Sequence, residues 1–118
     1  MVDDAAWYED GLAAVERWLR IGDSEMARID LAAFDLELSG YVRGEERVVF
    51  PAIEAMHPEP FAPTALMRHE HGTLRCLLLA VWSALDRGEP GRALEVLGGL
   101  RSVLVLHVAA EDWILRTT

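Results

Sequence analysis

The sequence predicts an all-α protein: an up-down-up-down four-helix bundle built from two repeated helical hairpins. Apolar residues recur at spacings of three and four, which is the period of a helix that buries one side. Segments rich in Gly, Pro and polar residues interrupt this pattern at 21–24, 57–63 and 87–91. A shift of 66 residues aligns the first half of the chain with the second and places Gly22 on Gly88, which indicates an internal repeat.

The three loops divide the chain into four expected helices, at 4–20, 24–50, 64–86 and 91–116. Asp23 or Ser24 can accept hydrogen bonds from the free N–H groups that begin the second helix, and Pro90 suits the first turn of the fourth. Pro51 should end or kink the second helix and leave 52–56 as a further turn.

We expect one domain over 1–118, composed of hairpins at 4–56 and 64–116. The net charge of −9 argues against a nucleic-acid partner and against an anionic membrane surface. The longest uninterrupted apolar runs fall far short of the roughly 20 residues that a membrane-spanning helix needs. The acidic N-terminal segment lacks the order of a signal peptide, and the single cysteine, Cys76, cannot form an internal disulfide. These features predict a cytoplasmic protein with no membrane partner.

Each expected helix has one inward-facing series of residues, and polar side chains replace apolar ones in these series near one end of the bundle. The series are Ala5, Tyr8, Leu12, Val15 and Leu19; Leu31, Phe34, Leu38, Tyr41, Glu45 and Val48; His71, Leu74, Leu78, Val81 and Leu85; and Leu97, Leu100, Leu104, His107, Glu111 and Ile114. Because neighbouring helices run antiparallel, Tyr41, Glu45, His71, His107 and Glu111 should meet at similar depth inside the bundle.

Two carboxylates in this interior require compensation, because burying each ionised carboxylate costs several kcal/mol. A divalent cation supplies the positive charge, and imidazole with carboxylate is a ligand set expected for iron, manganese or zinc. A metal-free network, in which protonated His71 and His107 pair with Glu45 and Glu111, is the alternative. Taken singly, each of these residues is more simply explained as a satisfied core residue or a surface pair.

The sequence resembles the hemerythrin-like (HHE cation-binding) family over essentially its whole length. The segment YVRGEERVVFPAIE (41–54) is similar to the family's H-x-x-x-E-E segment that ends in Phe-Pro, with Tyr41 in the histidine position. EHGTLRCLL (70–78) and HVAAEDWIL (107–115) are similar to the family's segments of the third and fourth helices. The resemblance implies a four-helix bundle that binds a non-haem di-iron centre, with histidines from all four helices and two bridging carboxylates.

Carried over by this resemblance, Glu45 and Glu111 would be the bridging carboxylates, and His71 and His107 would ligate one iron. The histidines of the other iron are missing, because the corresponding positions hold Ala5 and Tyr41. A further histidine found in oxygen carriers of the family, four residues after His71, is replaced by Arg75. We therefore expect one iron ion rather than two. Tyr41 is expected either to ligate it as a phenolate or to form hydrogen bonds, and a two-metal site would have to recruit Tyr41, Asp3, Asp4 or Glu9.

Other candidate residues receive structural interpretations. His69 should face solvent, since it lies about 200° around the helix from His71, and His57 should be a solvated loop residue. Cys76 is expected to be a small buried hydrophobe. Glu46 and Asp112 adjoin the proposed ligands and would replace them after a small helix rotation. Trp7, Trp18, Trp82 and Trp113 should in part cover the bundle ends, where an exposed cluster would indicate a homodimer face.

Three functions follow from these expectations. The first is a metal-binding protein with one non-haem iron, for sensing oxygen or oxidants or for handling iron, with open positions for water, oxygen, peroxide or nitric oxide. The second is an enzyme that uses the same iron to activate peroxide or oxygen. The third is a metal-free bundle that serves as a protein-interaction or structural module.

Overall fold

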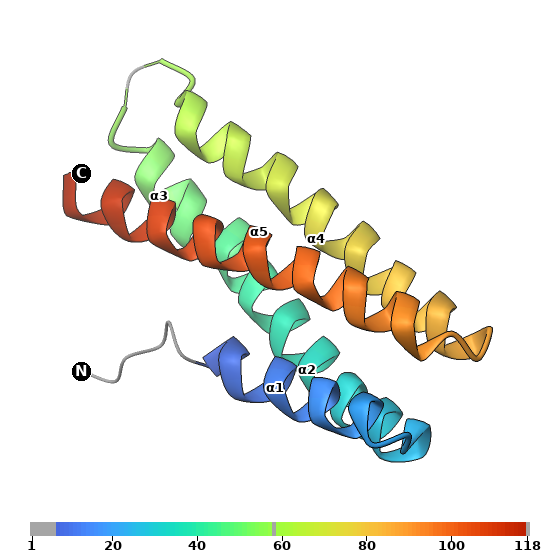
Figure 1. Ribbon diagram of the computed structural model, residues 1–118. Helices are drawn as coiled ribbons and strands as arrows, with labels where there is room; N and C mark the ends of the chain where they lie inside the picture. Colours follow the sequence, from blue (N-terminus) through green and yellow to red (C-terminus); the bar gives the residue numbers. More distant parts are fainter. Residues whose placement is uncertain (1–6, 58, 118) are drawn as a thin grey trace.

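The computed structural model describes residues 7–57 and 59–117, and helices account for almost all of this part of the chain. The elements are α1 (Trp7–Arg20), α2 (Ser24–Gly44), the π-helix η2 (Glu45–Val49), α3 (Phe50–Glu54), α4 (Ala62–Asp86) and α5 (Pro90–Thr117). Figure 1 shows two long hairpins, α1 with α2 and α4 with α5, and the run from α2 through α3 forms one continuous rod. Across the hairpins, α1 packs on α5 and α2 packs on α4. The predicted all-α four-helix bundle is confirmed.

The turns of the two hairpins have the same backbone hydrogen bonds. In the first turn the Gly22 N–H donates to the carbonyl of Leu19 and the next N–H donates to the carbonyl of Trp18. The same two bonds recur 66 residues later, around Gly88. Both glycines have positive φ, 85° and 67°, a conformation that costs other residues about 1–2 kcal/mol. The internal repeat of the sequence therefore corresponds to a repeated way of ending a helix.

The caps of the helices match their sequence signals. The Asp23 side chain accepts a hydrogen bond from the Met26 N–H at 3.0 Å, and α5 begins at Pro90. Pro51 does not end the helical run, because the chain continues from η2 directly into α3 with Pro51 in its first turn. The further turn expected at 52–56 corresponds to α3, which begins earlier, at Phe50. The proline lacks an N–H, and this position places it where the hydrogen-bond ladder already changes.

The π-helix η2 changes which residues face the core. Its characteristic bond joins the Phe50 N–H to the Glu45 carbonyl, five residues back, so one turn contains an additional residue. The prediction that Val48 faces inward is wrong: Val48 is 67% exposed, and Phe50 is fully buried instead. The wider turn keeps Glu45 inside and moves the next inward position along the chain.

Two apolar clusters fill the bundle. Among the expected inward residues the larger contains Tyr8, Leu12, Val15, Leu19, Leu31, Phe34, Leu38, Leu74, Leu78, Val81, Leu85, Leu97, Leu100 and Leu104. The smaller cluster contains Phe50, Ile53, Met67 and Ile114, near the loop that joins α3 to α4. The expected core residue Ala5 lies outside the described residues. The buried polar residues Glu45, His71 and His107 each lie, along their own helices, between residues of these two clusters.

The helix α5 has the length and apolar composition of a membrane-spanning helix. Uninterrupted apolar runs did not suggest this, because a few charged residues divide them. A core helix of a globular protein meets the same criterion, and α5 buries one side against α4 and α1. The absence of a membrane partner stays a prediction.

Candidate metal centre

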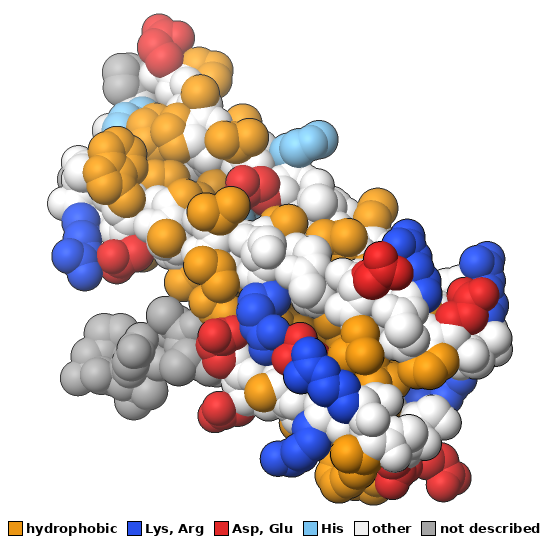
Figure 2. Space-filling view, in the orientation of Figure 1, with side chains coloured by type: hydrophobic (Ala, Val, Ile, Leu, Met, Phe, Trp, Pro, Cys, Tyr) orange, Lys and Arg blue, Asp and Glu red, His pale blue; other side chains and the backbone are white. Residues whose placement is uncertain are grey.

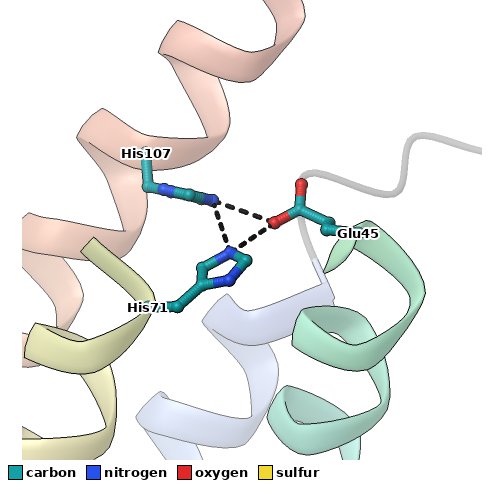
Figure 3. Close-up of side chains that lie close together, drawn as sticks. All are labelled: Glu45, His71 and His107. Atoms are coloured by element: carbon teal, nitrogen blue, oxygen red, sulfur yellow. Dashed lines mark hydrogen bonds and ion pairs between the residues drawn. The ribbon is translucent and has the colours of Figure 1, made fainter. Parts of the chain in front are cut away.

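Three buried side chains from three helical elements converge inside the bundle: Glu45 of η2, His71 of α4 and His107 of α5 (Figure 3). Each is at most 3% exposed. The Nε2 atoms of His71 and His107 lie 2.7 Å and 3.0 Å from the Oε1 atom of Glu45. The two Nε2 atoms are 3.3 Å apart. These three atoms therefore form a small triangle in the interior.

A second pair of carboxylates orients the two imidazoles. The Nδ1 atom of His71 lies 2.7 Å from Oε2 of Glu46, and the Nδ1 atom of His107 lies 2.7 Å from Oε1 of Glu70. A carboxylate only accepts hydrogen bonds, so each Nδ1 carries a proton and donates it. In the neutral form of each imidazole, the lone pair is then on Nε2 and points toward Glu45. Outer carboxylates hold metal-ligating histidines in this way.

The triangle fits a metal ion because each of its three atoms, Oε1 of Glu45 and Nε2 of His71 and of His107, can donate a lone pair to a cation. Three acceptor atoms within 3.3 Å of one another repel unless a cation or protons lie among them. Ligand atoms about 2.1 Å from a cation and about 90° apart are separated by about 3 Å, which matches the sides of the triangle. The other oxygen of Glu45, Oε2, is buried and has no hydrogen-bond partner. The residues present therefore suit a divalent metal.

Without a metal, protons must take its place. Burial opposes ionisation of Glu45, but hydrogen bonds from His107 and His71 outweigh it and hold the pKa of that carboxyl below its ordinary value. Burial likewise opposes protonation of His107, and the carboxylates of Glu45 and Glu70 outweigh it and raise the pKa of the imidazole. The metal-free form is thus an ion-paired cluster centred on Glu45. The expected pairing of the histidines with Glu111 is not found among the hydrogen bonds and ion pairs of the described residues, in which both histidines contact Glu45.

Tyr41 and Glu111 pair with each other beside the triangle. The Tyr41 hydroxyl donates to Oε1 of Glu111 at 3.2 Å, and its ring lies edge-on to His107. Burial, followed by the negative charge of Glu45, raises the pKa of Tyr41 well above its ordinary value, so the phenol is neutral in the metal-free protein. Oε2 of Glu111 is buried and has no hydrogen-bond partner. That Tyr41 and Glu111 are metal ligands stays a prediction.

Several other predicted positions can be compared with the structure. His69 is exposed, as expected. The prediction that Cys76 is buried is wrong: it is exposed, because it lies on the side of α4 that no other helix covers. His57 is half-buried rather than solvated, since its ring stacks on Phe61 with 3.9 Å between the centroids. Asp112 is exposed and pairs with Arg116, so it does not replace Glu111.

The proposed additional ligands of a second metal are not assembled. Glu9 pairs with Arg101 at 3.1 Å, and Asp3 and Asp4 lie outside the described residues. Among the described residues, only Glu45, His71 and His107 form a group with the spacing that a metal requires.

One important residue was not singled out from the sequence. Glu70 lies on α4 but reaches His107 on α5, a contact between helices that local periodicity does not reveal. Its position directly before His71 was the available signal: adjacent residues on a helix point about 100° apart, so Glu70 lies at the edge of the inward side, from where it can reach a neighbouring helix. Glu46 was considered only as a substitute ligand, whereas it holds His71 from outside.

A groove between α2 and α4 has His71 in one of its walls. It has a volume of about 290 Å³. Its other walls are Asp35, Leu38, Ser39, Val42, Leu74, Arg75, Leu78 and Leu79.

Comparison with known proteins gives one family. Residues 6–116 match the model described as hemerythrin HHE cation binding domain, which covers almost the whole chain. Neither the comparison with curated proteins nor the comparison with solved structures gives a significant match.

Proposed function

Because the chain belongs to the hemerythrin HHE cation-binding family, whose members bind metal, we propose that it holds one non-haem iron ion between Glu45, His71 and His107. The observation that carries this proposal is the triangle of three buried ligand atoms, each within 3.3 Å of the other two. We propose that the protein uses this ion to sense oxygen or oxidants or to handle iron.

The donor set supports iron with open positions. Two histidines and one carboxylate on one face of a metal are typical of mononuclear non-haem Fe(II) sites, while Mn and Zn accept the same donors. The metal would supply a Lewis-acidic, redox-active centre for a small ligand. Glu111 is the proposed fourth ligand through its buried Oε2 atom, and Tyr41 holds the other oxygen by a hydrogen bond.

One ion is proposed rather than two because the second set of ligands is incomplete. Tyr41 stands where the family has a histidine, and its neutral phenol is a poor ligand. Three neighbouring residues support the single site. Glu46 and Glu70 fix the orientation of the imidazoles, and Phe50 covers the His71 ring, with 5.4 Å between the two ring centroids. This apolar cover limits water at the histidines, while the groove between α2 and α4 admits small molecules.

Metal analysis of the purified protein tests the proposal. We expect close to one equivalent of iron in protein from iron-supplemented cells, and a steep loss in His107→Ala and Glu111→Ala. His69→Ala is the matched control, because His69 is exposed on the same helix as His71; His57→Ala is a second control. Equal loss in all four variants would refute the ligand assignment.

The groove also supports an enzymatic use of the same ion. Because His71 lines it, a peroxide or dioxygen molecule in the groove would lie beside a residue of the proposed metal site. Turnover of peroxide by iron-loaded protein, abolished in His107→Ala, would support an enzyme. If the protein repeatedly contains only traces of transition metal, the ion-paired cluster is the native state. The protein would then be a metal-free interaction or structural module.

A further inference from the structure

The exposed side of α5 carries a second regular series of residues. Gly98, Ser102, Val105, Ala109 and Trp113 follow one another at spacings of three and four, and all are exposed. By the helical period they lie opposite the buried series of the same helix. This exposed series, called the α5 outer face below, begins at Glu95 and ends at Arg116, both of which are also exposed.

The α5 outer face is apolar and uncharged along its middle. Val105 is 42% exposed, its neighbour Leu106 69% and Trp113 64%. Two charged residues stand between Glu95 and Asp112, and neither belongs to this series: Arg101 pairs with Glu9 and Glu16 of α1, and Glu111 accepts a hydrogen bond from Tyr41 of α2. Figure 2 shows apolar and uncharged side chains in a band along the front of the molecule, where α5 lies in Figure 1. An extended apolar surface of this kind marks a contact site.

The shape of this face is complementary to itself when two copies run antiparallel. If a two-fold axis passes between Val105 and Leu106, Trp113 of each copy lies over Gly98 of the other, and Ala109 lies over Ser102. Beyond its own turn of helix, a Cβ atom added at Gly98 or Gly99 would meet no atom within 4 Å, so the space above these glycines is open to an indole ring. Small residues also let two helices approach closely.

The charged residues at the two ends of the face also fit an antiparallel pair. About the same axis, Glu95 of each copy lies opposite Arg116 of the other, at both ends of the contact. A parallel arrangement would place like charges together, and it would also align the two helix dipoles. Among the described residues Glu95 has no ion-pair partner, and Arg116 contacts only the exposed Asp112 of its own helix. Because each copy carries a net charge of −9, an uncharged face is where two copies repel least.

From this complementarity of shape and charge, we propose that two copies of the chain pair antiparallel through the α5 outer face. The contact is isologous, so every interaction occurs twice. The metal-binding side chains point to the opposite side of α5, and the proposal therefore stands independently of the metal.

Sedimentation of the full chain, with and without a chelator, is the first test. We expect a dimer in the micromolar range, and a monomer in Ala109→Glu, which would place like charges near each other in the contact. Ala33→Glu is the matched control, since Ala33 is exposed in the middle of α2, and it should remain dimeric. A monomeric wild-type protein at all concentrations, or equal behaviour of the two variants, would overturn the proposal.

A charge exchange tests the register. Glu95→Arg alone and Arg116→Glu alone should each weaken association by roughly 3-fold to 30-fold, because each replaces two ion pairs with two like-charge pairs. The double variant should recover the wild-type dissociation constant. If the face instead bound a different protein or a lipid surface, the double variant would have no reason to regain the wild-type dissociation constant. A double variant that does not regain it refutes self-pairing in this register.

Cross-linking tests the position of the axis. In a Cys76→Ser background, Val105→Cys places two thiols next to the two-fold axis and should form a disulfide-linked dimer under mild oxidation. Leu36→Cys, at a 77% exposed position on α2, is the control and should stay monomeric under denaturing conditions. Cross-linking of both variants to the same extent would contradict the proposed axis.

Discussion

At the residue scale, the candidate centre depends on two kinds of carboxylate: one that faces the proposed metal position and two that contact the far side of the imidazole rings. Glu45 faces the Nε2 atoms of both histidines, and Glu46 and Glu70 accept from their Nδ1 atoms. Because Glu46 and Glu70 hold the protons on Nδ1, the lone pair of each neutral imidazole is on Nε2. Without these two carboxylates, an imidazole could carry its proton on the nitrogen that must bind metal.

We therefore expect Glu70→Gln to weaken metal binding by about 10- to 100-fold, the usual effect of removing such a partner. The amide still fills the space, so the free energy of unfolding should change little. Metal affinity measured by competition with a chromogenic chelator checks the prediction. Glu37→Gln, at an exposed position on α2, should bind as the wild type does; an unchanged affinity in Glu70→Gln would show that Glu70 does not orient His107.

Metal binding should also depend on pH. Since neighbouring carboxylates raise the pKa of His107 in the metal-free protein, the imidazole keeps a proton to higher pH than usual. The metal must displace this proton, so the apparent affinity should rise as the pH rises through that raised pKa and fall below it. Calorimetry in buffers of different ionisation enthalpy should show proton release on binding, and no release would contradict a protonated His107.

At the scale of helical elements, two devices set the geometry: the glycine turns and the π-helix. The turns end α1 and α4 with the same hydrogen bonds, which makes each hairpin antiparallel. The π-helix keeps Glu45 inside while Phe50 enters the smaller apolar cluster. Local insertions of this type are frequent at functional sites.

The turns give a direct stability prediction. Gly22→Ala and Gly88→Ala should each lower the free energy of unfolding by about 1 kcal/mol or more, because both positions have positive φ. Gly40→Ala is the matched control, since Gly40 lies exposed within α2 with nothing near an added Cβ. It should stabilise by about 0.5–1 kcal/mol through helix propensity. Urea denaturation measures all three, and destabilisation by Gly40→Ala would refute the argument.

At the scale of the whole molecule, the bundle concentrates negative charge around its two buried imidazoles. Glu45, Glu46, Glu70 and Glu111 contribute four carboxylates around two imidazoles, in a chain whose net charge is −9. The two apolar clusters on either side weaken screening by water. A cation at the centre should therefore stabilise the folded state.

Removal of the metal tests this consequence. Binding to the folded state alone adds about 4 kcal/mol when free metal is 1,000 times its dissociation constant. We expect chelated protein to melt at a clearly lower temperature than iron-loaded protein, and His107→Ala to melt at the same temperature with and without iron. An iron-loaded wild type that melts no higher than the chelated form would contradict a structural metal.

Sequence periodicity could predict much of this site because helices place residues by local geometry. His71, His107 and Glu45 fell on inward positions of their helices, and inward positions at similar depth must converge in an antiparallel bundle. The same reasoning failed at Val48 and Cys76, since it assumed one unbroken helical period in the first case and a covered helix face in the second.

By itself, the sequence determined the helical segments, the cap at Asp23 and most of the residues that face the core, because hydrogen-bond partners and apolar spacing within a helix are local. Only the tertiary structure decided that Glu70 holds a histidine of another helix and that Tyr41 pairs with Glu111. It also decided that a π-turn shifts the register after Glu45. These features depend on how helices are rotated and displaced against one another, and that relation is set by packing of the whole bundle.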